Sequence, residues 1–176
     1  MLRRVAIGFL AVALACTFEV SLGAVDGVRS IKFEVDIPNP ALKKDGLIVM
    51  TRDFLLMDAR RAQHYRDSFG PEKIRSIRRV TLTVVDVDIE GVDLAMTGPP
   101  TLLIAGHSLP GEPGAMVELE DGQVDWLKSN LLAGEPVVTS LTVELRVPLA
   151  ALDARMPSLH IIVEVQPTLV IDATWF

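Results

Sequence analysis

The densest group of side chains that could do chemistry is a run of carboxylates near the middle of the chain. It reads Asp86-Val-Asp88-Ile-Glu90-Gly91-Val-Asp93. Calcium takes about six to eight oxygen ligands, and an acidic loop with a sharply turning glycine can supply several of them. We therefore expect one of two arrangements here. Asp86, Asp88 and Glu90 form either a loose calcium site or the solvated face of a strand that ends at Gly91.

A serine flanked by histidine and proline is the second candidate. Gly106-His107-Ser108-Leu109-Pro110 follows the spacing Gly-x-Ser of a nucleophile elbow, but proline replaces the second glycine of that motif. Pro110 and the residues after it also exclude the helix that must follow such a serine. We expect a turn here, assign no catalytic residue and expect no enzyme. A hydrolase whose active site the sequence does not reveal stays an alternative.

The three histidines lie far apart in the chain. His64, His107 and His160 show none of the short spacings that are typical of metal-binding histidines. His160 lies inside an apolar run and is expected to be a structural residue. His64 is expected on the surface of a helix.

The beginning of the chain has the layout of a secretory signal peptide. Met-Leu-Arg-Arg is followed by eleven apolar residues, Val5 to Ala15, as in signal peptides with a basic start and an apolar stretch of about 7–15 residues. A helix of eleven residues spans only about half of the bilayer core. We therefore expect residues 1–15 to be removed and the protein to be exported.

The apolar run ends at Ala13-Leu14-Ala15-Cys16, and Cys16 is the only cysteine of the chain. This arrangement resembles the lipobox of bacterial lipoproteins. The resemblance implies that Cys16 becomes residue one, carries the lipid and anchors the protein in a membrane of the cell envelope, facing the periplasm or the cell surface. Cleavage by the ordinary signal peptidase, after Ala15 or after Gly23, stays the alternative.

The composition limits the possible partners. The chain has 176 residues, a net charge of −6 and 49% hydrophobic residues. One cysteine excludes an internal disulfide and any multi-cysteine metal site. The acidic balance argues against a nucleic-acid partner, and removal of Arg3 and Arg4 brings the net charge to −8.

Charge is unevenly distributed along the chain. Residues 52–79 hold eight Lys and Arg against four Asp and Glu, a net charge of +4. Residues 80–176 hold three against fourteen, a net charge of −11. We expect solvated faces, with a bipolar surface that steers a charged partner or binds cations as the alternative.

Alternation of apolar and polar residues is the main structural signal after Ser30. It predicts a strand at residues 31–37 and another at residues 80–89. In the second strand the apolar phase slips by one residue at Val84-Val85, which indicates a β-bulge or a strand crossing between sheets. Further strands are predicted at residues 101–105, 115–119, 137–147, 159–166 and 168–174. Between the last two of these, Pro167 is expected to mark a tight connection or a bulge.

Two segments have helical character. Phe54 to about Arg66 is rich in helix formers and stops before Gly70-Pro71. Trp126–Ala133 is expected to be a short helix, capped by Asp125 and ended by Gly134. We expect Trp126 to pack this helix onto the strands, with a platform for a sugar ring as the alternative.

Many strands, two short helices and Gly/Pro turns together predict a mainly all-β fold, an antiparallel β-sandwich. We expect a signal peptide at residues 1–15, a tether at residues 16–29 and one domain at residues 30–176. The expected function is binding or structural, in the cell envelope, with an unknown protein or glycan as partner. A Ca²⁺-dependent adhesion module and an envelope hydrolase are the alternatives.

Overall fold

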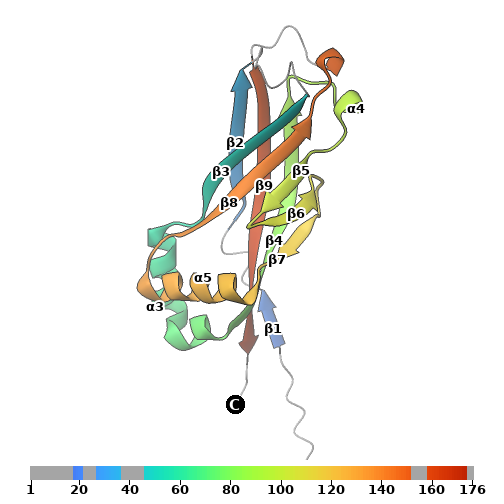
Figure 1. Cartoon of the computed structure of the whole chain (residues 1–176). Coiled ribbons are helices and arrows are strands. Elements are labelled where there is room, and N and C mark those ends of the chain that lie inside the picture. Colours follow the sequence, from blue (N-terminus) through green and yellow to red (C-terminus); the bar gives the residue numbers. More distant parts are fainter. Residues whose placement is uncertain (1–17, 22–26, 37–45, 152–157, 174–176) are drawn as a thin grey trace, which may run out of the picture.

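The computed structural model describes residues 18–21, 27–36, 46–151 and 158–173 (Figure 1). The expected signal peptide and Cys16 lie outside these residues. The elements in chain order are β1 (Phe18–Ser21), β2 (Arg29–Asp36), β3 (Leu47–Met57), α3 (Ala59–Arg75), β4 (Ile77–Glu90), α4 (Leu94–Thr97), β5 (Thr101–Ile104), β6 (His107–Pro110), β7 (Met116–Glu118), α5 (Asp121–Ala133), β8 (Val137–Arg146), the 3₁₀ turn η1 (Leu149–Ala151) and β9 (Ser158–Ala173).

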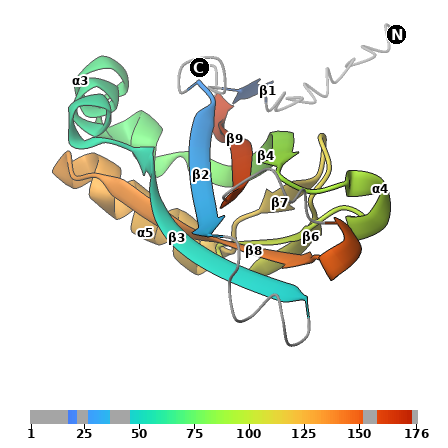
Figure 2. The same cartoon turned by 90° about the horizontal axis from the view of Figure 1, so that it is seen from above.

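Two antiparallel sheets form the two layers of the molecule, as Figure 2 shows from above. In sheet A the strand order is β1-β9-β4-β7, and β2 pairs with the same edge of β9 as β1. In sheet B the order is β3-β8-β5-β6. Helices α3 and α5 lie together at one end of the sandwich, which we call the helical end (Figure 1). The predicted fold class, a mainly β antiparallel sandwich, is confirmed.

The core lies between the inner faces of the two sheets. Alternate residues of β9 are buried, beginning with Leu159 and Ile161, and β8 contributes Leu141 and Val143 in the same way. Burying one such aliphatic side chain stabilises the fold by about 1.5–3 kcal/mol. The period-two pattern therefore decides which face of each strand turns inward.

A β-bulge interrupts β4 where the apolar phase slips. Val84 pairs with Val165, but Asp86 pairs with Glu164, so Val85 is an extra residue without a partner of its own in the ladder. Val84 is buried and Val85 is exposed. The slip is thus a bulge inside one sheet and not a crossing between sheets.

Strand β9 runs through Pro167 without a break. Pro167 pairs with Leu82, and the register with β4 does not shift there. The predicted connection or bulge at this proline is therefore wrong. On the other edge of β9, pairing with β2 ends at Val165 and pairing with β1 begins at Val170. Among the described residues, no strand pairs with this edge of β9 next to Pro167. Proline has no backbone N–H to donate, and at this position no hydrogen bond to a neighbouring strand is lost on that edge.

The first described strand lies inside the segment expected to be a tether. Residues Phe18–Ser21 pair with Val170–Ala173 of β9, so the prediction of a tether over residues 16–29 is wrong for these four residues. All described elements lie between residues 18 and 173. A chain that begins at Cys16 therefore keeps the whole described fold.

Helix α3 begins later than its sequence suggests. Phe54 and Leu55 belong to β3, where they pair with β8, so packing in the sheet overrides their neighbourhood of helix formers. Asp58 caps the helix by accepting a hydrogen bond of 2.8 Å from the backbone N–H of Arg61. The helix breaks at Gly70, whose φ is 74°, and continues from Pro71 to Arg75. The break agrees with the predicted stop before Gly70.

Helix α5 begins one turn earlier than expected. Glu120 is its N-cap, and the backbone N–H of Glu120 donates to Oε1 of Gln123 at 3.0 Å. The predicted cap, Asp125, lies inside the helix and forms an ion pair with Lys128. Gly134 ends the helix in the left-handed conformation, as predicted.

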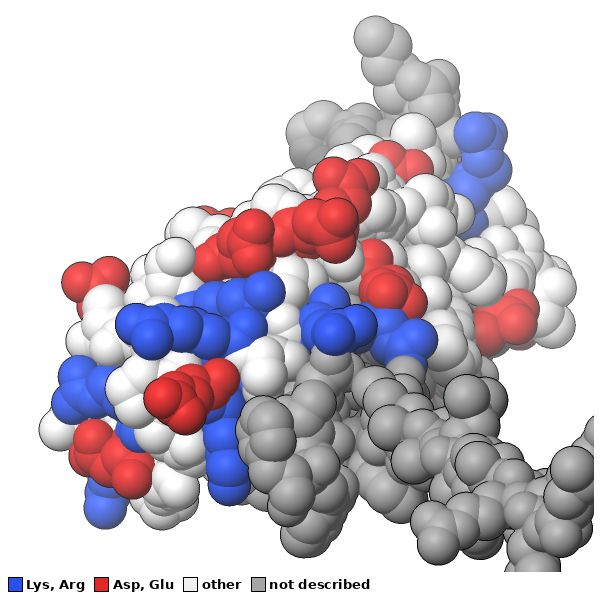
Figure 3. All heavy atoms as spheres, turned by 90° about the horizontal axis from the view of Figure 1, so that it is seen from below, with Lys and Arg blue, Asp and Glu red and all other residues white. Residues whose placement is uncertain are grey.

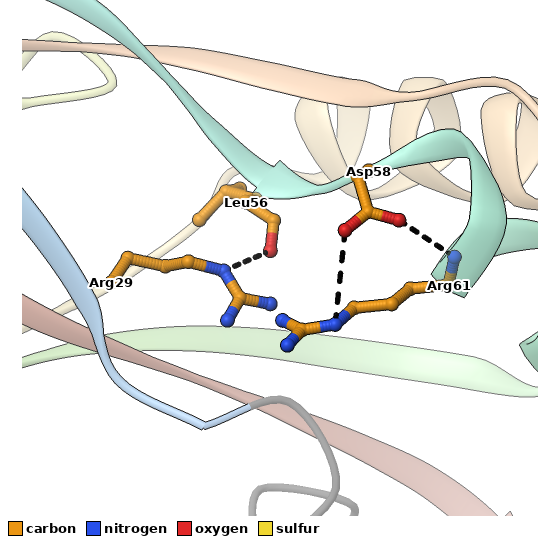
Figure 4. A network of polar contacts seen from close by, with 4 residues as sticks. All are labelled: Arg29, Leu56, Asp58 and Arg61. Atoms are coloured by element: carbon orange, nitrogen blue, oxygen red, sulfur yellow. Dashed lines mark hydrogen bonds and ion pairs between the residues drawn. The ribbon is translucent and has the colours of Figure 1, made fainter.

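An arginine joins the two sheets at the helical end (Figure 4). Nε of Arg29, at the start of β2, donates to the carbonyl of Leu56 in β3 at 2.9 Å. Asp58 follows two residues later, and its carboxylate lies 3.8 Å from Nε of Arg61. Arg29 and Arg61 therefore both contact the segment from Leu56 to Asp58, which leads into α3. Positive charge is thus concentrated where α3 begins.

Candidate functional site

A cleft of about 430 Å³ opens where sheet B meets α5. Aliphatic side chains from β3, α5 and the segment before α5 line part of it. Polar side chains from β3, α5 and β8 line the rest. The lining residues are Asp53, Leu56, Ala105, Leu119, Gln123, Trp126, Leu127, Val138, Thr139 and Ser140.

The turn between β5 and β6 forms one wall of this cleft. Ala105 and Gly106 both have positive φ, 51° and 87°, which is the geometry of a two-residue hairpin turn that matches strand twist. Among the described residues, Ala105 alone adopts positive φ without being glycine. That conformation costs an L-residue about 1–2 kcal/mol. The strain lies at the cleft, where strained residues often have a functional reason.

Two hydrogen bonds hold Ala105 in this conformation. Its N–H donates to the carbonyl of Ser140 at 3.2 Å. Its carbonyl accepts from Nε2 of Gln123 at 2.9 Å. Because Oε1 of Gln123 also accepts from the N–H of Glu120, one side chain joins the start of α5 to the hairpin. The hairpin wall and the helix are therefore positioned together.

Trp126 lies on the lining of the cleft and is 47% exposed. The residues that pack α5 onto the sandwich are Val124, Leu127 and Leu131, which are all buried. The prediction that Trp126 packs the helix is therefore wrong. The helical period turns the three aliphatic residues to the core and leaves the indole at the cleft.

The cleft combines an indole, a carboxylate, an amide and a hydroxyl group. Asp53 and Ser140 are cross-strand partners in β3 and β8. Such a surface suits a ligand with an apolar face and several polar groups at its edge. The described side chains that line the cleft include no histidine, cysteine or lysine. This arrangement supports the binding of such a ligand.

The outer face of sheet B adjoins the cleft and carries exposed apolar side chains. Leu55 and Val138 are cross-strand partners, 47% and 40% exposed. Thr51 and Thr142 join their hydroxyl groups at 2.8 Å further along the same two strands. Exposed apolar side chains that gather on one face mark interaction surfaces. We call this surface the apolar face; its residues are Leu47, Val49, Thr51, Leu55, Val138 and Thr142, and Asp53, Glu144 and Arg146 lie at outward positions between them.

The carboxylates proposed as a calcium site lie in a row. Asp86, Asp88 and Glu90 occupy alternate, exposed positions up to the end of β4. Alternate residues of a strand lie about 6.6 Å apart, whereas calcium ligands lie about 2.3–2.6 Å from the ion. In the described parts of the chain, no three His, Cys, Asp or Glu side chains are grouped so that they could hold a metal ion. The arrangement is that of a solvated strand face.

The serine of the elbow-like segment lies in a strand. His107 and Ser108 belong to β6, and the turn is formed by Ala105 and Gly106. The predicted turn is therefore placed two residues too late. Successive residues of a strand point to opposite faces, so Ser108 points away from His107.

A second serine and histidine meet on the outer face of sheet A. Oγ of Ser158 lies 2.9 Å from Nε2 of His160 and donates to Oε1 of Glu34 at 3.3 Å. A hydroxyl group has one proton, so a serine that donates to Glu34 accepts from the histidine. A general base must instead accept that proton. This contact orders side chains across β2 and β9, in agreement with a structural role for His160.

Most residues of the cleft leave little signal in the sequence. Asp53, Ala105 and Ser140 come from three different strands or turns and follow no motif. The signals that exist are Trp126, with few aromatic residues around it, and the spacing of Glu120 and Gln123, which is typical of a helix start. Lipidation of Cys16, which lies outside the described residues, stays a prediction.

Comparison of the chain with protein families, curated proteins and solved structures found no match in any of the three. In the part of the chain that the structure describes, none of the helices has both the length and the apolar character needed to cross a bilayer.

Proposed function

We propose that the protein is an exported cell-envelope protein, held at a membrane by a lipid on Cys16, and that its cleft binds a glycan. The exposed indole of Trp126 beside Asp53, Gln123 and Ser140 is the observation that carries the binding role. The order of basic residues, apolar run and Cys16 supports export and anchoring.

The chemistry of a sugar ring fits the surroundings of Trp126. One face of many pyranose rings presents C–H groups, which pack against an aromatic ring, while the hydroxyl groups lie at the edge. Asp53 accepts hydrogen bonds from such hydroxyls, and the hydroxyl of Ser140 both donates and accepts. The cleft volume of about 430 Å³ lies within the usual range for small-ligand sites, about 300–1,000 Å³.

Fluorescence of Trp126 tests the glycan role. The chain has two tryptophans, so Trp175→Phe in a chain that begins at residue 16, with Cys16→Ser, leaves Trp126 as the reporter. We expect β-1,4-linked N-acetylglucosamine oligomers to shift its emission in a saturable way. Trp126→Ala in the otherwise unchanged chain should abolish binding in calorimetry.

Met116 offers the matched control. Its side chain is 62% exposed in β7 of sheet A and does not line the cleft. Met116→Ala should leave binding of the oligomers unchanged. No saturable response, or equal losses in Met116→Ala and Trp126→Ala, would exclude the cleft as a site for these glycans.

A protein partner is the second candidate, favoured by the apolar face. Leu47, Val49, Leu55 and Val138 are between 39% and 55% exposed on neighbouring strands. A photo-crosslinking residue at Val49 should form adducts in the envelope, and one at Asp88, on the outer face of sheet A, should not. Equal labelling at both positions would contradict this role.

Processing in cells tests the anchor. Full-length chain is expressed in a bacterium, and its lipoprotein signal peptidase is inhibited. We expect the precursor to accumulate. A Cys16→Ser chain that is still processed at the same position and rate would show that the ordinary signal peptidase acts instead.

A further inference from the structure

Strand β1 brings the beginning of the mature chain to the helical end. Val20 in β1 pairs with Ile171 in β9, and Ile171 pairs on its other side with Ile77 at the start of β4. Side chains of Ile77 and Ile171 meet those of Tyr65 and Ile74 from α3. Figure 1 shows β1 beside the lower end of β9, at the same end as α3 and α5.

The chain between Cys16 and this strand is very short. Thr17 is the one residue between Cys16 and Phe18, the first residue of β1. An extended chain gains about 3.3–3.6 Å for each residue, so Cys16 and Phe18 lie at most about 7 Å apart. A lipid on Cys16 therefore holds the helical end against the membrane surface.

Basic side chains gather at this end. Lys73, Arg75 and Arg78 are exposed on both sides of Ile77, and Figure 3 shows Lys and Arg in a band across the end of the molecule. Arg75 and Arg78 also line a groove of about 610 Å³ against α5. The basic residues of this end are Arg29, Arg60, Arg61, Arg66, Lys73, Arg75, Arg78, Arg79 and Lys128.

Acidic residues are as numerous among the described residues of the helical end, and Figure 3 shows Asp and Glu beside the band of Lys and Arg. Asp125 forms an ion pair with Lys128 in the groove, and Asp58 and Asp67 form ion pairs with neighbouring arginines. The strongly acidic part of the chain, residues 80–176, has a net charge of −11 and extends to the opposite end. The acidic residues of the helical end are Asp58, Asp67, Glu72, Glu120, Asp121, Asp125, Glu135 and, by strand register, Glu19 and Asp172.

We propose that the helical end is a membrane-contacting surface, on which Lys73, Arg75 and Arg78 bind the headgroups of anionic lipids. The proposal builds on the lipid anchor proposed for Cys16. Electrostatic interactions extend about 8–10 Å at physiological salt, and the connection of about 7 Å keeps the start of β1, at the helical end, within that range of the membrane. The same field repels the acidic remainder, which orients the opposite end of the sandwich away from the bilayer.

Vesicle flotation tests this surface without the lipid anchor. The chain from residue 16 with Cys16→Ser is mixed with vesicles of phosphatidylcholine alone or with about 30% phosphatidylglycerol. We expect binding to the anionic vesicles only, lost in 0.5 M NaCl. Lys73→Gln/Arg75→Gln should weaken it by at least about ten-fold, since each Lys or Arg near such a surface contributes about five-fold.

The matched control is Lys32→Gln/Arg146→Gln, which removes the same charge from exposed positions in β2 and at the far end of β8. It should keep wild-type binding, and urea unfolding of both variants checks that the fold is retained. Binding to neither vesicle, equal binding to both, or equal losses in the two variants would overturn the proposal. Because Cys16 is absent from this chain, these outcomes are independent of whether the anchor itself is correct.

Discussion

The outer faces of the two sheets differ sharply although their inner faces are alike. On sheet A, Asp86 lies opposite Glu164, and Glu34 and Glu90 flank His160 from both sides. On sheet B the outward positions carry the exposed leucine and valine and the paired threonines of the apolar face, and its charged residues, Asp53, Glu144 and Arg146, are of both signs.

The difference shows what the period-two pattern can and cannot specify. Inward positions in both sheets must be apolar because they bury surface against the other sheet. Outward positions are set by solvent or by a partner. A face of like charges suits solvent, whereas neutral exposed apolar side chains beside a cleft suit a partner. The residues that face outward therefore decide which sheet faces solvent and which one suits a partner.

The prediction with the largest expected effect tests whether the inner faces of the two sheets contribute equally to one core. Ile161→Ala in sheet A and Leu141→Ala in sheet B each leave a cavity between fully buried neighbours. Each should lower the free energy of unfolding by about 2–5 kcal/mol in urea titrations. Val49→Ala, on the apolar face, is the control and should change it by less than about 0.5 kcal/mol. A loss below about 1 kcal/mol in one sheet only would show that its inner face is not part of the common core.

The second prediction concerns the wall of the cleft. Gln123→Ala removes the bonds to the carbonyl of Ala105 and to the N–H of Glu120. We expect a loss of about 1–3 kcal/mol in the free energy of unfolding. Gln63→Ala on the exposed face of α3 is the matched control, with a change near zero. Equal changes in the two variants would mean that Gln123 does not join helix and hairpin.

The third prediction concerns the strain in the same wall. Ala105→Gly relieves the positive φ of 51° and should stabilise the protein by about 1 kcal/mol. Ala105→Val should destabilise it, because a β-branched side chain is still less tolerant of that conformation. If the strain serves the cleft, Ala105→Gly should also weaken binding of the sugar oligomers in calorimetry. Stronger binding in this variant would show that the strain has no role in positioning the wall.

The sequence pattern predicted those features that depend on local alternation or on one special residue. The bulge at Val85 follows from a phase slip, and the end of α5 at Gly134 follows from its tolerance of positive φ. Both are decided by nearby residues. The bulge and the helix end can therefore be predicted from the sequence without knowledge of any long-range contact.

Features decided by long-range pairing were not predictable in the same way. Phe54 lies beside helix formers, but its pairing with Thr139, 85 residues later, keeps it in β3. Pro167 is tolerated because β1 and β2 leave an interval on one edge of β9. Trp126 lines the cleft because three aliphatic residues of α5 bury the opposite face. The first two outcomes depend on residues far away in the chain, and the third on the part of the cleft that β3 and β8 place beside α5.

The smallest expected effect tests the charged outer face of sheet A. Asp86 and Glu164 are direct cross-strand partners, and like charges in such a pair are destabilising. Glu164→Lys replaces the repulsion by an attraction and should raise the free energy of unfolding by about 0.2–1 kcal/mol, less at high salt. Glu118→Lys is the matched control, since its partner, Thr81, is uncharged. An equal gain in both variants would reflect net charge alone, whereas a gain confined to Glu164→Lys would show that Asp86 and Glu164 repel each other in the folded protein.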